Sequence, residues 1–335
     1  MKKTFLLACC LLGLASADTM AAMSKRVVMI TQIVEHPALN AVREGVIKYL
    51  REHGYADADL QIVYENAQGS PAIAAQIAQK FSGENPDAIV AISTPSAQAV
   101  AQAVRGRVPI VFAALTDPME AKLIKDPSEP SGNITGVTDK APFAQQIAFI
   151  KKVVPHMTKL GFLYNPGEVN SVTALKLVTK IAKDLGLELV PQAVNRTSEV
   201  GVSTQALVGK VQAVYIPNDN TVASGLEAAV KVGNSESLPL FAADILLVER
   251  GLVGMIGFDY ADQGRQAGAM VDRILNGEAT RSIPVEDPQI LHTYLNKDAA
   301  EKMGVTLPQE LLKDANKVYD GTPPLPKADK EKKEN

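Results

Sequence analysis

The sequence predicts two doubly wound α/β domains, each built on a parallel sheet with helices on both faces. Apolar runs of strand length alternate with segments of helical period along most of the 335 residues. The runs are rich in Val, Ile, Leu and Ala and lack an alternating polar face, which is typical of strands buried on both sides. The series occurs twice, around a turn-rich break at residues 125–140, and strict alternation of strand and helix favours doubly wound folds.

The first series occupies residues 26–124 and contains four strand–helix pairs. We expect strands at 26–34, 60–66, 87–93 and 108–115, followed by helices at 37–55, 71–83, 95–105 and 117–124. Gly54 is expected to stop the first helix, because glycine adopts the left-handed conformation that often ends helices.

The second series begins after the break and repeats the same rhythm. We expect strands at 159–165, 187–194, 212–217 and 238–244, with helices at 171–186, 198–210 and 221–233. The last third is less regular, and residues 251–277 and 282–304 could extend either domain.

The N-terminal residues predict export. Lys2 and Lys3 precede a short apolar segment that ends in Ala15-Ser16-Ala17, the small-x-small pattern of a signal-peptidase site. We therefore expect a signal peptide at residues 1–22, with cleavage near 17–22, and a periplasmic location. Leu6 to Cys9 loosely resembles a lipoprotein cleavage box, but the apolar stretch before Cys9 is short, which favours soluble export over a lipid anchor. Both cysteines lie in this segment, so the mature chain would carry neither disulfide nor thiol chemistry.

Composition and motifs exclude several classes of function. The net charge of −3 lacks the excess of basic residues that is typical of nucleic-acid-binding proteins. No later apolar run is long enough to span a membrane. The charged residues 323–335 are expected to form a flexible, solvated tail. The glycine patterns of nucleotide-binding loops, the G-x-S-x-G elbow and H-E-x-x-H are absent from the sequence, and its four histidines are scattered. We therefore expect no enzyme activity, no metal and no cofactor.

Polar residues gather at the predicted strand ends, where parallel sheets bind ligands. His36, Thr94, Asp117 and Asn165 each stand directly before a proline. Helix capping alone would favour such pairs, because proline suits the first helical position and the residue before it can cap. The full set comes from both halves of the chain, and two domains facing each other across a cleft would bring it together: Gln32, Glu35, Thr94, Ser96, Thr116, Asp117, Asn165, Glu168, Asn170, Ser171, Asn218, Asp219, Asn220 and Asp244.

The chemistry of these strand ends suits a zwitterion. The helix that starts at Pro95 offers unpaired N–H groups and the hydroxyls of Thr94 and Ser96, which favour an anionic group such as a carboxylate. Asp219 and Asp244 offer negative charge for an ammonium group. An amino acid fits better than a sugar, because sugar sites often stack the ring on tryptophan and the sequence contains none.

Eight blocks in order carry a resemblance to a known family. They are TQIVEHPALNAVREGVIKYLREHGY, STPSAQA, ALTDPMEAKLI, SGNITGVTD, GFLYNPGEVNS, YIPNDNTVAS, LPLFAAD and the segment from IGFDYADQGRQAG to ILNGE. Together they resemble the ABC-transporter substrate-binding proteins of the tryptophan-binding, TrpX-like type. The resemblance runs from about Arg26 to Val318.

The resemblance implies a type I periplasmic-binding fold, in which two lobes joined by three crossovers close on a ligand. It implies lobe 1 at 26–137 plus about 258–283, and lobe 2 at 138–257 plus about 284–322. The family's ligands are aromatic amino acids. Ser93, Thr94 and Ser96, with Thr116 or Asp117, would hold the carboxylate, and Asp219 or Asp244 the ammonium. The remaining expected ligand-binding residues are Gln32, Glu35, Asn165, Asn170, Ser171 and Asn220.

The expected partners are an ABC permease and its cytoplasmic ATPase, with a monomeric receptor. Three alternatives remain open on the sequence. The two-lobed protein could be a sensor that presents its closed form to a membrane receptor. It could instead bind a nucleoside or a sugar. The chain could also be a secreted enzyme that acts on a small amine or acid.

Overall fold

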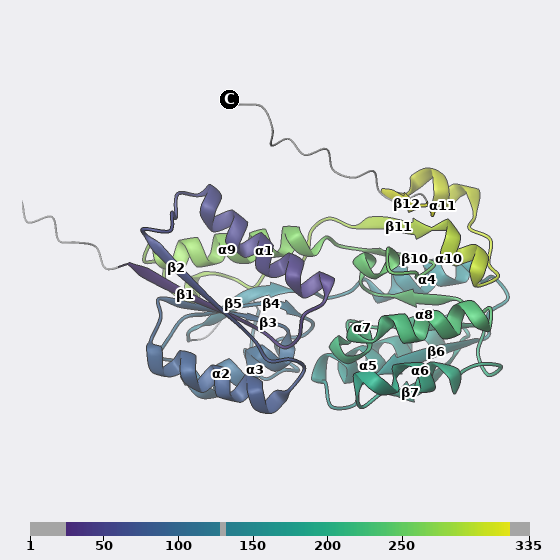
Figure 1. Cartoon of the computed structure of the whole chain (residues 1–335), viewed down its shortest axis with the longest axis horizontal. Helices are drawn as coiled ribbons and strands as arrows, with labels where there is room; N and C mark the ends of the chain where they lie inside the picture. The colour runs from purple at the N-terminus through teal and green to yellow at the C-terminus, as the bar shows by residue number, and fades with distance from the viewer. Residues whose placement is uncertain (1–24, 128–131, 322–335) are drawn as a thin grey trace, which may run out of the picture.

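The computed structural model describes residues 25–127 and 132–321, which form two α/β lobes (Figure 1). Each lobe has its own core of buried apolar side chains. We call the lobe that contains the N-terminal strand lobe 1 and the other lobe 2. The expected signal peptide at 1–22 and the charged tail at 323–335 lie outside the described residues. Within the described residues, no helix combines the length and the apolar character needed to cross a membrane.

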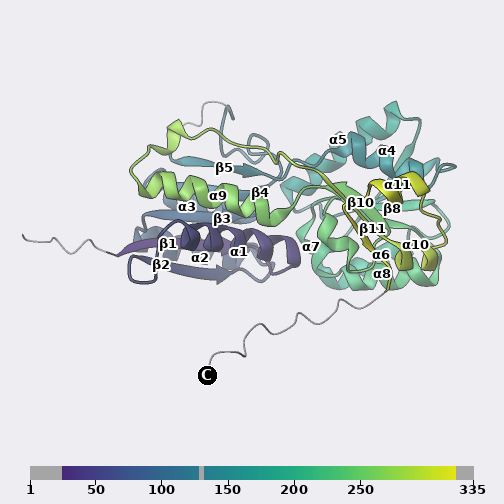
Figure 2. The same cartoon turned by 90° about the horizontal axis from the view of Figure 1, so that it is seen from above.

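Lobe 1 contains a five-stranded parallel sheet in the order β2-β1-β3-β4-β5. Helices α1 and α9 pack together, and α2 packs beside α3 in a second pair (Figures 1 and 2). The elements are β1 (Arg26–Gln32), α1 (Pro37–Glu52), β2 (Leu60–Asn66), α2 (Pro71–Glu84), β3 (Ala88–Ile92), α3 (Thr94–Val104), β4 (Ile110–Leu115), β5 (Ile134–Thr138) and α9 (Tyr260–Leu275). The three central strands are almost wholly buried, as their apolar composition predicts.

Lobe 2 contains a four-stranded parallel sheet, β7-β6-β8-β9, and a smaller sheet, β10-β11-β12. In the smaller sheet β10 runs antiparallel to β11, and β12 runs parallel to β11. The elements are α4 (Phe143–Val153), β6 (Lys159–Tyr164), α5 (Val169–Asp184), β7 (Glu188–Ala193), α6 (Val200–Gln205), β8 (Ala213–Ile216), α7 (Asn220–Ser224), α8 (Leu226–Ser235), β9 (Leu240–Ala242), β10 (Gly254–Gly257), β11 (His292–Asn296), α10 (Lys297–Lys302), α11 (Gln309–Asp314) and β12 (Lys317–Tyr319).

Three segments connect the lobes. The chain leaves lobe 1 after β5, returns after β10 to form α9, and leaves again after Ile283, which is buried in the lobe 1 core. Helix α9 is fixed by glycines that let backbones approach closely. A Cβ on Gly264 would stand 2.2 Å from the carbonyl oxygen of Val42 in α1, and one on Gly45 would meet the carbonyl oxygen of Ala261 at 2.4 Å. The returning helix is therefore an integral part of lobe 1.

Two local expectations were wrong. Residues 117–124 form successive turns and not a helix, with the Asp117 carboxylate accepting the N–H groups of Met119 and Glu120. The turn-rich break contains β5, a fully formed strand of the sheet. Gly136 explains why β5 is hard to recognise, because its φ of +155° and the Phe112 carbonyl oxygen, 2.1 Å from where a Cβ would stand, require glycine in a strand.

Candidate functional site

The strand ends of both lobes meet around an enclosed cavity, which we call the polar cavity. Its free space is small, about 20 Å³, where one water needs roughly 10–15 Å³. It is lined by His36, Ala38, Leu39, Thr94, Ala114, Thr116, Asp139, Asn170, Pro217, Asn218, Asp219, Asn220, Ala223, Asp244, Leu247 and Tyr260. Because these residues come from both lobes, the polar cavity lies between the lobes.

The N-terminus of α3 forms one wall of the polar cavity. Ser93, the residue before the helix, has φ +85° and ψ 157°, a conformation that non-glycine residues seldom adopt. Its hydroxyl makes no capping hydrogen bond to the helix. Strain of this kind persists where the surrounding structure enforces it, and it is concentrated at ligand sites.

Three hydroxyls at this helix start are buried without a hydrogen-bond partner: Ser93 Oγ, Thr94 Oγ1 and Ser96 Oγ. Each of these residues is at most 2% exposed. Backbone N–H groups in the first turn also lack an intrahelical acceptor. Buried polar groups are nearly always paired, so three free hydroxyls beside a positive helix end mark a place for an anionic group.

The end of β4 is shaped by a bulge next to the cavity. The register of β4 on β5 shifts between Phe112 and Leu115, and Ala114 has a φ of +50°. The side chain of Gln263 in α9 fills the gap, since its Oε1 accepts the N–H of Ala114 at 3.0 Å. The bulge places Thr116 on the cavity wall, and its hydroxyl donates to Asp139 Oδ1 at 2.8 Å.

Asp139, directly after β5, is a buried acid that was missing from the sequence-based set. Burial raises its pKa to about 6, against the opposing hydrogen bonds from Thr116, Asn218 and Tyr260. Asn218 of lobe 2 donates to the backbone oxygen of Asp139 at 3.0 Å. The only signal available in the sequence was its place after a strand, and that strand was not recognised.

Asp244 has one carboxylate oxygen free. Oδ1 accepts the N–H of Leu246 at 2.8 Å and begins the 3-10 helix η2 (Ile245–Val248), whereas Oδ2 is buried without a partner. Burial raises the pKa of Asp244 to about 7, and the nearby charges of Asp139 and Asp259 act in the same direction. Asp139 and Asp244 thus bring two carboxyl groups to one cavity whose lining contains no Lys or Arg.

Asp219 also lines the polar cavity, but both of its oxygens are occupied. Oδ1 accepts the N–H of Val222 at 2.8 Å and caps α7. Oδ2 accepts the N–H of Asn165 and the hydroxyl of Ser171, both at 2.6 Å. Burial and the charge of Glu168 raise its pKa to about 7. Its hydrogen bonds join the end of β6, the start of α5 and α7, so its role within lobe 2 is structural.

Glu168 organises the same corner of lobe 2. One carboxylate oxygen accepts the side chain and the backbone N–H of Asn220 at 2.6 and 3.2 Å, and the other accepts the hydroxyl and the N–H of Thr221 at 2.8 and 3.1 Å. These bonds orient Asn220 so that its Oδ1 faces His36 of lobe 1 at 3.4 Å. Burial lowers the pKa of His36 to about 4, which keeps the ring neutral, and its Nδ1 has no partner.

The structure divides the predicted site residues into three groups. Six line the polar cavity: Thr94, Thr116, Asn170, Asp219, Asn220 and Asp244. Ser93 and Ser96 are buried beside Thr94 with free hydroxyls. The others are engaged locally: Gln32 with Asn40 and Arg43, Glu35 with Arg43 and Tyr64, Asp117 in its turn, Asn165 with Thr221, and Ser171 with Asp219. Of these, Asn165 also lines the larger space described next. Residues that the prediction omitted are Asp139, Tyr260, His36 and Leu39, of which Tyr260 reaches the site only because α9 returns to lobe 1.

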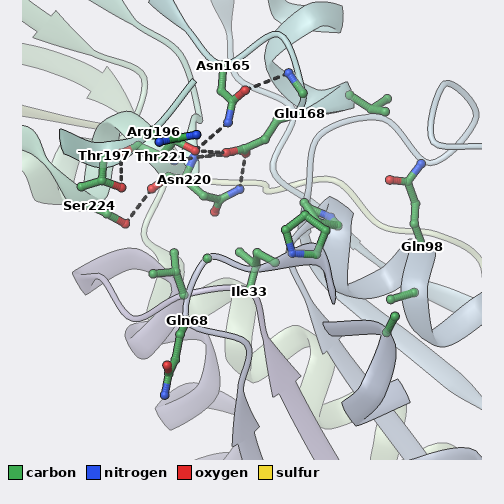
Figure 3. A pocket seen from close by; sticks show the side chains of 18 of the residues that line it. Ile33, Gln68, Gln98, Asn165, Glu168, Arg196, Thr197, Asn220, Thr221 and Ser224 are labelled. Carbon is green, nitrogen blue, oxygen red and sulfur yellow. Dashed lines mark hydrogen bonds between the residues drawn. The ribbon is translucent and has the colours of Figure 1, made fainter. Parts of the chain in front are cut away.

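A second and larger space adjoins the polar cavity, and we call it the groove (Figure 3). It has a volume of about 810 Å³ and lies between α2 and α3 of lobe 1 and the loops after β6 and β7 of lobe 2. Figure 3 shows Ile33 and Gln68 on one side, facing Asn220, Thr221 and Ser224 on the other. Asn220 lines both spaces.

No metal site accompanies these carboxylates. Among residues 25–127 and 132–321, no three His, Cys, Asp or Glu side chains come together in a way that could hold a metal ion.

Comparison with known proteins gives a family match over nearly the whole described chain. Residues 27–319 match the model of the family described as ABC transporter substrate binding protein. A tyrosine-binding protein of Clostridioides difficile (strain R20291) is 35% identical over 275 residues, which cover 82% of this chain and 79% of that protein.

Solved structures give the same result for the fold. The ABC domain from Streptococcus pneumonia in complex with L-Trp is 33% identical, with a TM-score of 0.85 over 88% of this chain and 100% of that one. The ligand-free, open structure of a substrate binding protein with adhesive properties from Clostridium difficile is also 33% identical. Its TM-score is 0.67, and the match covers 88% of this chain and 99% of that one. The expected type I periplasmic-binding fold is confirmed.

Proposed function

The chain belongs to the family of ABC transporter substrate-binding proteins, and from that premise we propose that it is an exported receptor whose lobes close around a free aromatic amino acid. The family binds substrates and does not transform them, so the site is a binding site and not a catalytic centre. The observation that carries the proposal is that unpaired donors and an unpaired acid face one polar cavity from the two lobes.

The carboxylate of the ligand is assigned to the start of α3. Thr94 and Ser96 supply free hydroxyls, and the first turn supplies free N–H groups and the positive end of the helix dipole. A ligand carboxylate there would satisfy buried groups that the protein leaves unpaired, and hydrogen bonds to a charged group are worth about 1.5–3 kcal/mol each.

The ammonium group is assigned to Asp244, with Asp139 as the second carboxylate. Asp244 has a free oxygen that points to no protein donor, whereas Asp219 has none to spare. Two buried acids repel each other when both are ionised, and an ammonium group between them removes that repulsion. His36 is held neutral, so it does not compete as the cation.

Contact with both lobes explains how binding is coupled to closure. The carboxylate site belongs to lobe 1 and Asp244 to lobe 2, so a zwitterion joins them only when the lobes are together. A ligand that binds one state better shifts the population toward that state. The closed form is the one that a membrane-embedded ABC permease with its cytoplasmic ATPase would recognise.

Aromatic ligands are favoured because of the relatives. One is described as a tyrosine-binding protein, and another was solved with L-Trp. The test is a thermal-unfolding panel of the twenty amino acids, sugars and nucleosides, on protein that has been unfolded and refolded to remove bound ligand. A ligand at a hundred times its Kd should add about 2.7 kcal/mol to the free energy of unfolding. Stabilisation by sugars or nucleosides alone would overturn the proposal.

A further inference from the structure

We propose that the aromatic ring of the ligand lies in the groove, between Ile33 of lobe 1 and Val169 of lobe 2, while only the ammonium and carboxylate groups occupy the polar cavity. The inference rests on the proposed function and identifies the part of the site that selects the side chain. It assigns a role to a surface that the zwitterion assignments leave unused.

The polar cavity is unsuited to an aromatic ring. Its free space of about 20 Å³ is far smaller than that of the groove, about 810 Å³, and its wall carries three carboxyl groups, Asp139, Asp219 and Asp244. A ring placed among them would desolvate these acids without offering them a hydrogen bond, which is unfavourable. The charged end of an amino acid is smaller than an aromatic ring, and its ammonium group can donate hydrogen bonds to these acids.

The two spaces are lined by neighbouring residues of the same chain segments. Thr94 lines the polar cavity and Pro95 the groove; Asn170 lines the cavity and Val169 the groove. Asn220 lines both. An α-carbon near the start of α3 would therefore stand at the boundary, with its charged groups on one side and its side chain directed into the other space.

The inner part of the groove is apolar, and it is large enough for an indole ring. Its apolar lining includes Ile33, Val34, Pro95, Ala99 and Val169, contributed by both lobes. A volume of about 810 Å³ lies within the usual range of small-molecule sites, roughly 300–1,000 Å³. We therefore expect phenylalanine, tyrosine and tryptophan all to be accepted.

The outer part of the groove is polar. Gln68, Gln102, Asn195 and Arg196 line it with carboxamide and guanidinium groups. These groups can pair with a phenol hydroxyl or an indole N–H, so the groove does not require a purely hydrocarbon side chain. Among the described residues, the only carboxylate that lines the groove is that of Glu168, and both of its oxygens already accept hydrogen bonds. A basic ligand side chain would therefore find no free carboxylate there.

The test is methyl NMR on protein labelled at Ile, Val and Leu methyl groups and saturated with L-Trp. We expect intermolecular NOEs from the indole protons to the methyls of Ile33, Val34 and Val169. NOEs to Leu39 and Leu247, which line the polar cavity, would place the ring there and overturn the inference. An absence of NOEs to all three groove residues while L-Trp is bound would overturn it as well.

A matched pair of variants gives an independent readout. Ala75 and Ala72 are both exposed alanines of α2, but only Ala75 lines the groove. Ala75→Phe should weaken L-Trp binding by at least about tenfold, and Ala72→Phe should leave it unchanged. Equal affinities in both variants and the wild type would argue against ring placement in the groove. If the wild type binds no aromatic amino acid at all, it is the proposed function that fails.

Discussion

The hydroxyl of Ser171 donates a hydrogen bond of 2.6 Å to Oδ2 of Asp219, so this carboxylate is engaged within lobe 2. The same oxygen accepts the N–H of Asn165, and Oδ1 caps α7. Asp244 lines the same cavity with a buried oxygen, Oδ2, that has no hydrogen-bond partner among the described residues. Two buried aspartates that look equivalent in the sequence therefore differ in their hydrogen bonding, and of the two only Asp244 is assigned the ammonium group.

Paired substitutions should separate these two roles. Asp244→Asn keeps the acceptor that begins η2 but removes the charge, so we expect ligand affinity to fall by about 100-fold or more with unfolding free energy unchanged or higher. Asp219→Asn would replace an accepting oxygen with an NH₂ group, which cannot accept the hydrogen bonds from the Asn165 N–H and the Ser171 hydroxyl. It should therefore lower the free energy of unfolding by about 1–3 kcal/mol. Calorimetric titration and chemical denaturation of both variants measure the two effects. A binding loss confined to Asp219→Asn would reverse the assignment.

Removal of a free hydroxyl tests the carboxylate site. Thr94→Val preserves the shape of the side chain and eliminates a buried hydroxyl that has no partner, so the free protein should be as stable as the wild type or more stable. Affinity for the amino acid should fall by about tenfold or more, since a charged hydrogen bond is lost. Thr204→Val is the control, because Thr204 is buried in α6 and its hydroxyl bonds to the Val200 carbonyl oxygen. That variant should lose stability and keep its affinity.

The sequence was sufficient to predict the architecture because buried parallel strands have a distinctive composition. The central strands of the two larger sheets are mainly apolar and largely buried, and these were recognised. Strand β5 was missed because Gly136, Thr135 and Thr138 replace that pattern. The Thr135 hydroxyl compensates by donating to the Ile283 carbonyl oxygen at 2.7 Å, a partner 148 residues away that no local pattern reveals.

The site was only partly predictable for a related reason. Position at a strand end indicates which edge of the sheet a residue occupies, but not which partner its side chain finds. Gln32 stands at the end of β1, yet its side chain is held by Asn40 and Arg43 of α1. Tyr260 lies far along the chain and enters the cavity through the return of α9. Such outcomes depend on tertiary packing, which spacing in the sequence does not encode.

Binding should depend on pH through the buried acids. Burial raises the pKa of Asp139 to about 6 and of Asp244 to about 7, above the ordinary value of 3.8. The free folded protein then holds more protons than the unfolded chain, so these groups lower stability as pH rises from about 4 to 7. His36, with a pKa lowered from 6.5 to about 4, acts in the opposite direction up to pH 6.5. Burial also raises the pKa of Asp219 to about 7, so three acids oppose one histidine, and stability should fall across the whole interval from about pH 4 to 7.

The same acids should make ligand binding release protons. An ammonium group favours the ionised carboxylates, so affinity should increase from pH 5.5 to 8. Titration calorimetry near pH 6 in buffers of different ionisation enthalpy should detect proton release, which should decrease near pH 8. Asp244→Asn should reduce that release in proportion to its share. An affinity independent of pH across this range would contradict ammonium binding by these carboxylates.

Lobe closure can be measured with an ion pair that joins the two lobes. Lys176 of α5 in lobe 2 lies 3.6 Å from Glu120, in the turns after β4 of lobe 1, and both side chains are more than half exposed. The only cysteines in the sequence are Cys9 and Cys10, so replacing these with serine allows spin labels to be placed at 120 and 176 alone. We expect a longer and broader distance distribution without ligand, which shortens to a single narrow one with saturating amino acid, because the zwitterion bridges the lobes. Labels at Glu65 and Lys80, an ion pair within lobe 1, should give the same distance in both conditions. If the distance between labels at 120 and 176 is the same with and without ligand, binding and closure are not coupled. The control pair shows whether the ligand changes label behaviour in general.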